Sequence, residues 1–341
     1  MSVEPGMAPA LQTQARVPEG AHIPDFFIVG HQKCGTTALW AMLRRHPQIF
    51  MPDQKEPRFL APDLASRFAQ RGEWKPDRRP RSLEQYFSLF ASAGPEQRAG
   101  EASPEYLRSS IAAARIAELQ PAARIIAILR EPASFLRSLH LQLVSSNVET
   151  QRDFRKALTL QDARRRGKRI PRRCHHPESL LYSDHVHYVD QLRRFHAELP
   201  HEQVLVLIYE DFKRDNQTTL RRVLHFLEVD DTVPIEVLQT KPVKAVRSLA
   251  LHQLAGSVRA ARDRPAAASS ISRAANALVP ARLRQSQRFR AAWQRVVYMA
   301  PAGADEELMR ELRRRFKGEV EAISEYLGRD LITLWGYDRV D

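Results

Sequence analysis

The residues with the clearest chemical capacity lie between positions 30 and 37, where an apolar segment ends and a helical pattern begins. Glycines at 30 and 35 permit a tight backbone turn, and the amides at the start of the following helix would point at whatever lies above it. Thr36 and Thr37 add hydroxyl donors, and Lys33 adds a full positive charge. Residues of these types at this spacing predict a phosphate-binding cradle.

This cradle differs from the Walker A loop of nucleoside triphosphatases. A Walker A loop places its lysine directly after the second glycine, whereas here that position is Thr36 and the lysine is Lys33. The next strong apolar segment, 124–129, is not followed by the aspartate that holds magnesium in those enzymes. The pattern therefore favours phosphate binding without a required metal ion over a P-loop kinase.

A second anion site is expected where that apolar segment ends. Arg130 lies at its carboxyl end, and Ser138 follows about two helical turns later. The guanidinium group offers a fixed fork of donors that suits a phosphate monoester better than a solvated lysine does. Arg130 alone also fits a salt bridge at the start of a helix, but together with the first cradle it favours a ligand with two separated phosphate groups.

Both motifs resemble those of 3′-phosphoadenosine 5′-phosphosulfate (PAPS)-dependent sulfotransferases, and LRRHP with the later KEPRF resembles their heparan-sulfate and bacterial carbohydrate branch. By this resemblance GHQKCGTTAL binds the 5′-phosphosulfate of PAPS, the co-substrate, through Lys33, Cys34, Gly35, Thr36, Thr37 and Ala38. Arg130 and Ser138 would bind the 3′-phosphate. A related pattern has arginine and tyrosine where this chain has Phe135 and His140, which bears on the subfamily more than on the nucleotide site. Arg247, after a segment similar to the family's variable loop, is a further cofactor candidate.

The resemblance also implies a general base. A KExxFF segment carries it in that branch, and Lys55, Glu56 and Phe59 match the segment, whereas Leu60 replaces the second phenylalanine. Glu56 is therefore the expected base. Lys33 is the expected catalytic cation beside the departing 5′-phosphate.

The pKa of Glu56 and the choice of base stay open in the sequence. Apolar neighbours would raise this pKa, whereas Lys55 and Arg58 would lower it. Glu101, in GEASPEYL, is a reserve base or an acceptor-orienting group, and His140 suits a phosphate donor as well as catalysis. Structural or surface positions are expected for His46, His175, His176, His185 and His187.

The elements that position these residues follow from hydrophobic periodicity. Short apolar segments predict strands at 25–30, 48–51, 98–102, 124–129 and 203–208. Helical periodicity predicts helices at 36–45, 82–90, 109–119, 133–146, 151–165, 178–199, 216–228 and 305–327. Beyond Val229 no strand is expected, and the last third is expected to be helical. The alternation predicts an α/β fold, a P-loop-like three-layer arrangement with a mostly parallel central sheet flanked by helices.

Composition limits the wider setting. Residues 1–24 are expected to form a flexible tail, and 25–341 one domain. Two cysteines, Cys34 and Cys174, fit no disulfide framework or metal spacing, and no segment reaches membrane-spanning length, which together favour a cytoplasmic protein. The net charge of +13 lacks the interleaved aromatic residues of a nucleic-acid surface but is compatible with anionic substrates or a peripheral membrane contact.

The expected function is sulfuryl transfer from PAPS to a hydroxyl or amine. The branch resemblance favours a carbohydrate or a glycosylated metabolite as acceptor, and no metal or redox cofactor is implied. Two alternatives remain at this point. One is a kinase-like phosphotransferase, and the other is a basic module that binds nucleotides or nucleic acid without turnover.

Overall fold

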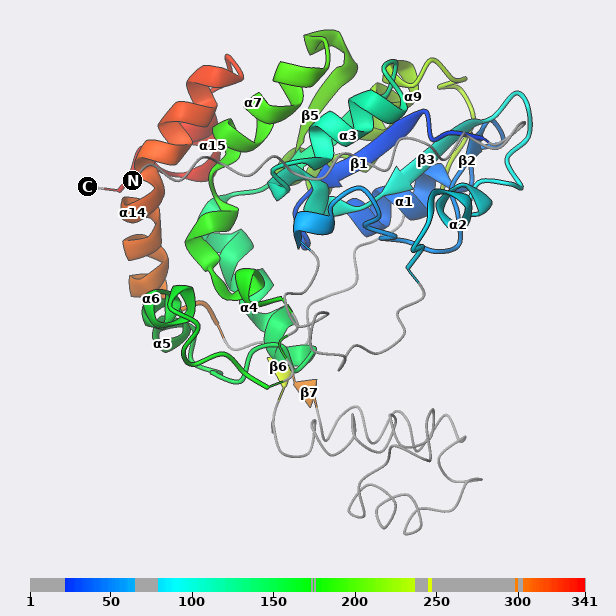
Figure 1. Cartoon of the computed structure of the whole chain (residues 1–341). Helices are drawn as coiled ribbons and strands as arrows, with labels where there is room; N and C mark the ends of the chain where they lie inside the picture. Colours follow the sequence, from blue (N-terminus) through cyan, green and yellow to red (C-terminus); the bar gives the residue numbers. More distant parts are fainter. Residues whose placement is uncertain are drawn as a thin grey trace, which may run out of the picture. The chain divides into compact units, whose positions relative to one another are not determined.

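The computed structural model describes residues 22–64, 79–172, 174, 176–236, 245–246, 298–299 and 303–340 (Figure 1). The chain divides into two compact units. Unit 1 consists of Met1–Glu131, Ser183–Thr240 and Lys317–Arg339, and unit 2 of Pro132–Tyr182, Lys241–Phe316 and Val340–Asp341. Most of the expected N-terminal tail lies outside the described residues, and the expected single domain stays a prediction.

Unit 1 is built on a five-stranded sheet with the order β2-β3-β1-β4-β5. The strands are β1 (Phe26–Gly30), β2 (Ile49–Phe50), β3 (Arg98–Ala102), β4 (Arg124–Leu129) and β5 (Val204–Ile208). Every pair is parallel, with Ile28 of β1 beside Ile126 of β4 and Ala102 of β3. All five residues of β1 are buried, as expected when helices cover both faces of a parallel sheet. The prediction of a parallel α/β sheet is confirmed.

Seven helices of unit 1 either connect these strands or follow the last of them among the described residues (Figure 1). They are α1 (Thr36–Leu43), α2 (Leu83–Ser88), α3 (Ala112–Leu119), α7 (Tyr188–Glu198), α8 (Tyr209–Arg214), α9 (Asn216–Phe226) and α15 (Leu331–Trp335). Helices α3 and α7 pack against each other. Because the strands are all parallel, the strand ends that carry the motifs meet at one edge of the sheet, the usual ligand site of an open α/β fold.

Unit 2 contains α4 and shorter elements. They are α4 (Pro132–Ser145), α5 (Phe154–Thr159), α6 (Gln161–Arg165), the two-residue strands β6 (Ala245–Val246) and β7 (Tyr298–Met299), and the first part of α14 (Glu306–Tyr326). Strands β6 and β7 pair antiparallel, so the expectation of no strand beyond Val229 is wrong at these two positions. Glu149 and Arg164 form a buried ion pair at 2.8 Å.

The predicted helix over 178–199 is wrong in its first half. Two 3₁₀ turns occupy Pro177–Leu180 and Tyr182–His185, and α7 begins only at Tyr188. Leu180 and Tyr182 are both fully buried. Residues two apart project about 200° apart on an α-helix, so one helical face could not bury both. The predicted helix over 151–165 is also divided, into α5 and α6.

Candidate active site

The cradle predicted after the first strand is a turn between β1 and α1. Gly30 has φ 132°, and a Cβ there would lie 2.6 Å from the Ile128 carbonyl oxygen of neighbouring β4. Gly35 precedes α1 with φ 91°, and a Cβ there would lie 3.0 Å from the Phe212 ring. Both positions therefore require glycine, and the chain can turn tightly while the first amides of α1 face outward.

Lys33 and Arg130 lie together at the carboxyl ends of adjacent strands. Arg130 Nη1 donates a hydrogen bond of 2.8 Å to the Lys33 carbonyl oxygen, and the guanidinium carbon lies 4.5 Å from the centre of the Tyr209 ring. Burial and the nearby charge of Arg130 lower the pKa of the Lys33 ammonium group. Two cations that destabilise each other in a half-buried turn create a site that favours an anion.

The other cradle residues differ in exposure. Thr37 is exposed and Thr36 is buried, while Ala38 N donates to the Gly35 carbonyl at 2.9 Å in the first turn of α1. Cys34 is fully buried, and burial raises the pKa of its thiol to about 12. Cys34 therefore offers no reactive thiolate, and its backbone amide donates to the His31 carbonyl oxygen at 3.3 Å.

Ser138 and Arg247 complete the predicted nucleotide contacts. Ser138 lies on α4 in unit 2, where it is 5% exposed. Its Oγ is buried without a hydrogen-bond partner among the described residues. Such a hydroxyl is unusual because most buried polar groups are paired. Arg247 lies outside the described residues.

Glu56 lies in a turn that is anchored to the sheet. Its backbone N–H donates to the Ala102 carbonyl oxygen at the end of β3, at 3.1 Å. Its carboxylate contacts Lys55 Nζ at 2.7 Å and Arg58 Nη2 at 2.6 Å. Burial would raise the pKa of Glu56, but the two cations outweigh burial and lower the pKa to about 2. The direction that the sequence left open is therefore downward, and Glu56 is a carboxylate.

The backbone is strained at both positions expected to act on the substrate. Lys33, Glu56 and Arg58 have φ values of 70°, 61° and 54°, in the left-handed region that residues other than glycine rarely occupy. Such conformations cost about 1–3 kcal/mol each and concentrate at functional sites. Their presence in both turns is consistent with a shared functional role.

A chain of contacts joins the Glu56 turn to the cradle. Arg58 binds Glu56 through one nitrogen and Glu105 through another, the latter at 2.7 Å. Gln32, directly before Lys33, donates a hydrogen bond of 3.0 Å to Glu105. The structure thus brings together the two predicted parts of the site. The sequence offered no signal for Gln32 or Glu105, because their contact spans 73 residues of chain.

Glu101 lies beneath the Glu56 turn and is fully buried. The Tyr86 and Tyr106 hydroxyls both donate to Glu101 Oε2, the latter at 3.1 Å. Tyr106 in turn accepts a hydrogen bond from the Leu60 backbone amide at 3.1 Å, and Phe59 stacks on Tyr86 at 4.9 Å. Burial raises the pKa of Glu101 to about 7. This position suits a structural group better than direct contact with an acceptor.

Two of the histidines weighed as candidates, His46 and His140, are held by neighbouring groups. His46 accepts from Gln48 N and contacts the Asp230 carbonyl oxygen, in agreement with its expected structural role. The two ring nitrogens of His140 contact the Tyr182 hydroxyl at 2.9 Å and the Arg152 carbonyl oxygen at 3.1 Å. His185 and His187 precede α7 rather than lying on a long helix. His175 lies outside the described residues.

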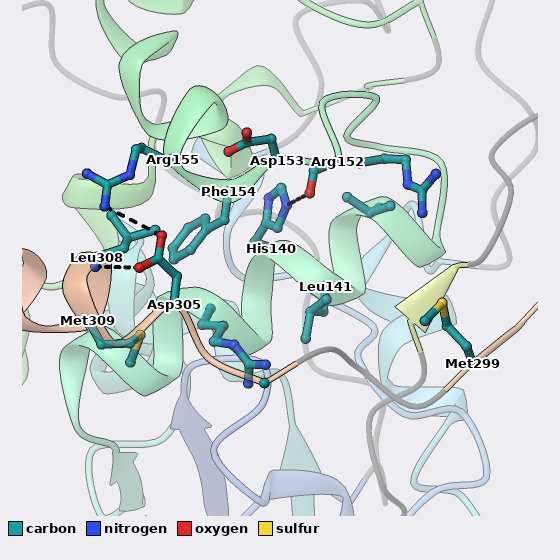
Figure 2. A pocket seen from close by; sticks show the side chains of 13 residues that line it. His140, Leu141, Arg152, Asp153, Phe154, Arg155, Met299, Asp305, Leu308 and Met309 are labelled. Atoms are coloured by element: carbon teal, nitrogen blue, oxygen red, sulfur yellow. Dashed lines mark hydrogen bonds and ion pairs between the residues drawn. The ribbon is translucent and has the colours of Figure 1, made fainter.

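A pocket of about 420 Å³ lies in unit 2, beside α4, α5 and α14 (Figure 2). Apolar side chains such as Leu141 and Leu308 line it together with arginines. Arg155 is bound there by Glu311 at 2.6 Å and by Asp305 at 3.4 Å. No cradle residue and no residue of the Glu56 turn lines this pocket.

Neither a metal-binding cluster nor a membrane-spanning helix occurs in the described parts of the chain. No group of three or more His, Cys, Asp or Glu side chains is arranged there to hold a metal ion. Each helix within these ranges is too short or too polar to span a lipid bilayer.

Comparisons with known proteins converge on one family. The sequence model described as "Sulfotransferase family" matches residues 24–233. Human carbohydrate sulfotransferase 15 is 30% identical over 176 residues, covering 40% of this chain and 30% of the relative. Mouse bifunctional heparan sulfate N-deacetylase/N-sulfotransferase 4 is 28% identical over 215 residues, covering 61% of this chain and 22% of the relative. This chain thus matches less than a third of the length of either relative.

A solved structure extends the comparison to most of the chain. The crystal structure of a sulfotransferase from Alicyclobacillus acidocaldarius superimposes with a TM-score of 0.62 at 24% identity. The match covers 92% of this chain and 99% of that protein, so the two share a fold.

Proposed function

This chain belongs to the sulfotransferase family, and from that premise we propose that it transfers a sulfuryl group from PAPS to a hydroxyl or amine of an acceptor. The observation that carries the proposal is the pair of cations at the carboxyl ends of β1 and β4, where Arg130 Nη1 lies 2.8 Å from the Lys33 carbonyl oxygen. A multiply charged anion relieves the repulsion between two such cations. PAPS carries charge at both its 5′ and 3′ positions and meets this requirement.

The donor groups present suit both ends of PAPS. Lys33 and the backbone amides of residues 35–37 would hold the 5′-phosphosulfate, with Cys34 and Ala38 shaping the turn on either side. Arg130 and Ser138 would bind the 3′-phosphate, and the buried Ser138 hydroxyl, without a hydrogen-bond partner among the described residues, supports a role in ligand binding. Arg247 is proposed as a further contact on the basis of sequence alone.

The proposed reaction moves one sulfuryl group and one proton. The acceptor oxygen or nitrogen attacks sulfur, the bond between sulfur and the bridging oxygen of the 5′-phosphate breaks, and adenosine 3′,5′-bisphosphate (PAP) leaves. Lys33 and the cradle amides stabilise the negative charge that grows on the departing phosphate. Glu56 takes the acceptor proton.

The low pKa of Glu56 affects this last role. At a pKa of about 2 the group is fully ionised but only weakly basic in the free protein. Lys55 and Arg58 cause the low value, and negative charge brought by PAPS opposes their effect. PAPS binding therefore raises the basicity of Glu56 toward the range that proton transfer requires.

We propose a carbohydrate or glycosylated metabolite as acceptor. The support is the similarity to proteins named carbohydrate sulfotransferase 15 and heparan sulfate N-sulfotransferase 4. We further propose a cytoplasmic location, supported by two cysteines, Cys34 and Cys174, that are both buried and free.

The test measures binding and transfer separately. PAP binding is measured by calorimetry, and transfer by incubating sulfur-labelled PAPS with a panel of carbohydrate and small-molecule acceptors. Lys33→Ala and Arg130→Ala are each expected to weaken PAP binding about 100-fold, since each removes a charge-assisted contact worth about 1.5–3 kcal/mol. Glu56→Gln is expected to bind PAP like wild type and to lose most transfer. Chelator is expected to leave transfer unchanged.

Three results would count against the proposal. Equal loss of PAP affinity in all three variants would remove the division between binding and catalytic residues. Phosphoryl transfer from ATP and magnesium, without transfer from PAPS, would identify a kinase. Salt-sensitive binding to DNA or RNA without PAP binding would identify a nucleic-acid-binding module.

A further inference from the structure

Two acidic residues of unit 1 neighbour Arg130, Glu131 in the sequence and Glu210 in space. Glu131 follows it directly and is 5% exposed. Glu210 follows Tyr209, whose ring lies beneath the Arg130 guanidinium group. The Glu131 backbone amide donates to Glu210 Oε1 at 3.4 Å. The charge of Arg130 acts on the Glu210 carboxylate, which therefore lies close to the cation expected to bind the 3′-phosphate. A carboxylate beside an arginine competes with phosphate for the same donors.

The C-terminal segment supplies a hydrogen-bond donor to each carboxylate. Trp335 Nε1 donates to Glu210 Oε2 at 2.9 Å, and the Tyr337 hydroxyl donates to Glu131 Oε1 at 2.9 Å. Trp335 is 4% exposed and Tyr337 is fully buried. These contacts join residues that are 125 and 206 positions apart in the chain. Each donor thus binds one oxygen of a carboxylate that is not exposed to solvent.

The backbone around these two donors is well defined. Asp330 caps α15 by accepting a hydrogen bond from Thr333 N at 2.9 Å. Gly336 ends the helix with φ 71°, the left-handed conformation usual at a helix end. Trp335 and Tyr337 lie on either side of this glycine, so one short helix end delivers both donors.

Arg130 itself is held by Tyr188 and by the backbone of Lys33. The Tyr188 hydroxyl donates to the Arg130 carbonyl oxygen at 2.8 Å, and Arg130 Nη1 donates to the Lys33 carbonyl oxygen at 2.8 Å. We infer that Trp335 and Tyr337 are positioning residues for Arg130, because they bind the neighbouring carboxylates and leave the guanidinium group oriented for the 3′-phosphate. This inference rests on the proposed function, in which Arg130 binds that phosphate.

The test compares two probes in the full-length protein. PAP carries the 3′-phosphate, and adenosine 5′-monophosphate (AMP) lacks it. Wild type is expected to prefer PAP over AMP, and Arg130→Ala to lose that preference. Trp335→Phe and Tyr337→Phe are each expected to reduce the PAP-to-AMP preference about tenfold, as loss of one hydrogen bond to a charged group would. Calorimetry measures both dissociation constants.

A matched control is Tyr86→Phe. This substitution also removes a hydroxyl that donates to a buried carboxylate, that of Glu101. Glu101 is not one of the two acidic residues that neighbour Arg130. The PAP-to-AMP preference of Tyr86→Phe is expected to equal that of wild type. In the Trp335→Phe background, Glu210→Gln is expected to restore the preference, because a neutral amide competes less for the guanidinium group.

The outcomes separate this inference from the proposed function. A wild-type protein with no preference for PAP over AMP would overturn the 3′-phosphate site and the inference with it. A wild-type preference that Arg130→Ala abolishes, but that both C-terminal variants keep, would overturn the inference alone. Equal weakening of PAP and AMP in the C-terminal variants would indicate general loosening of the fold and would also overturn it. If Tyr337→Phe does not fold, Trp335→Phe decides the question.

Discussion

Replacing Glu101 with glutamine is expected to stabilise the protein in a way that depends on pH. Burial raises the pKa of Glu101 from 4.5 to about 7, so folding favours the protonated acid. Below about pH 4.5 the group is protonated in both the folded and unfolded states and is not penalised. As pH rises through 7 the folded protein must ionise a buried carboxyl group, and the stability that it had at low pH is lost.

The size of the effect follows from the two pKa values. One pKa unit corresponds to about 1.4 kcal/mol, so the difference between 4.5 and about 7 corresponds to roughly 3 kcal/mol. The groups that face the carboxyl group are the hydroxyls of Tyr86 and Tyr106, which donate to one oxygen, and the side chain of Ser103, whose hydrogen bonding also lowers the pKa. A glutamine side chain keeps an oxygen for them and carries no charge. Any cost of its amide group is the same at every pH and does not alter the pH dependence.

The assay is urea unfolding at several pH values between about 4.5 and 8.5, followed by circular dichroism. Relative to wild type, Glu101→Gln is expected to gain roughly 3 kcal/mol of unfolding free energy across this range. Glu118→Gln, on the exposed face of α3, serves as the control and is expected to show a constant difference. The reasoning would be refuted if the difference in unfolding free energy between Glu101→Gln and wild type stayed constant with pH. It would also be refuted if wild type became more stable relative to this variant as pH rises.

Three further predictions concern other parts of the chain. Gly35→Ala puts a Cβ on a residue with φ 91° and 3.0 Å from an aromatic ring of α8, so PAP binding measured by calorimetry should weaken about tenfold. Unchanged affinity would argue against the cradle geometry. Since the pKa of Glu56 is about 2, kcat/KM should show no acid limb from this carboxyl group between about pH 4 and 7, whereas a limb centred near 4.5 would mean that Lys55 and Arg58 do not control it. Arg164→Ala leaves the buried carboxylate of Glu149 without its ion-pair partner and should lower the unfolding free energy by about 3–5 kcal/mol in urea titrations, which a change below 1 kcal/mol would contradict.

Local pattern was sufficient for much of the fold. Each of the five predicted strands is present within one residue of its expected bounds. Buried parallel strands read as continuous apolar segments in β1, β4 and β5, whereas β3 also contains Arg98 and Glu101. The helix over 178–199 failed in its first half because residues 177–180 and 182–185 form two separate 3₁₀ turns, in which Leu180 and Tyr182 are both buried. Apolar content alone did not distinguish these turns from a helix.

Local order alone determined the cradle. Gly30, Lys33 and Gly35 lie within six residues of sequence, and the spacing of the two glycines is enough to predict a tight turn. Burial and distant partners decided the rest. The pKa of Glu101 rises because burial outweighs the hydrogen bonds from hydroxyl groups, whereas the pKa of Glu56 falls because Lys55 and Arg58 outweigh its burial.

The same reason explains the contacts around Arg130. Trp335 and Tyr337 reach Glu210 and Glu131 across 125 and 206 residues, and no spacing within the sequence encodes such a meeting. The motif order therefore predicted two phosphate sites, and the phosphate contacts stay a prediction. Only the packing of the C-terminal helix onto the sheet unit decided which side chains hold Arg130 in place, since hydrogen bonds between distant residues exist only once the chain has folded.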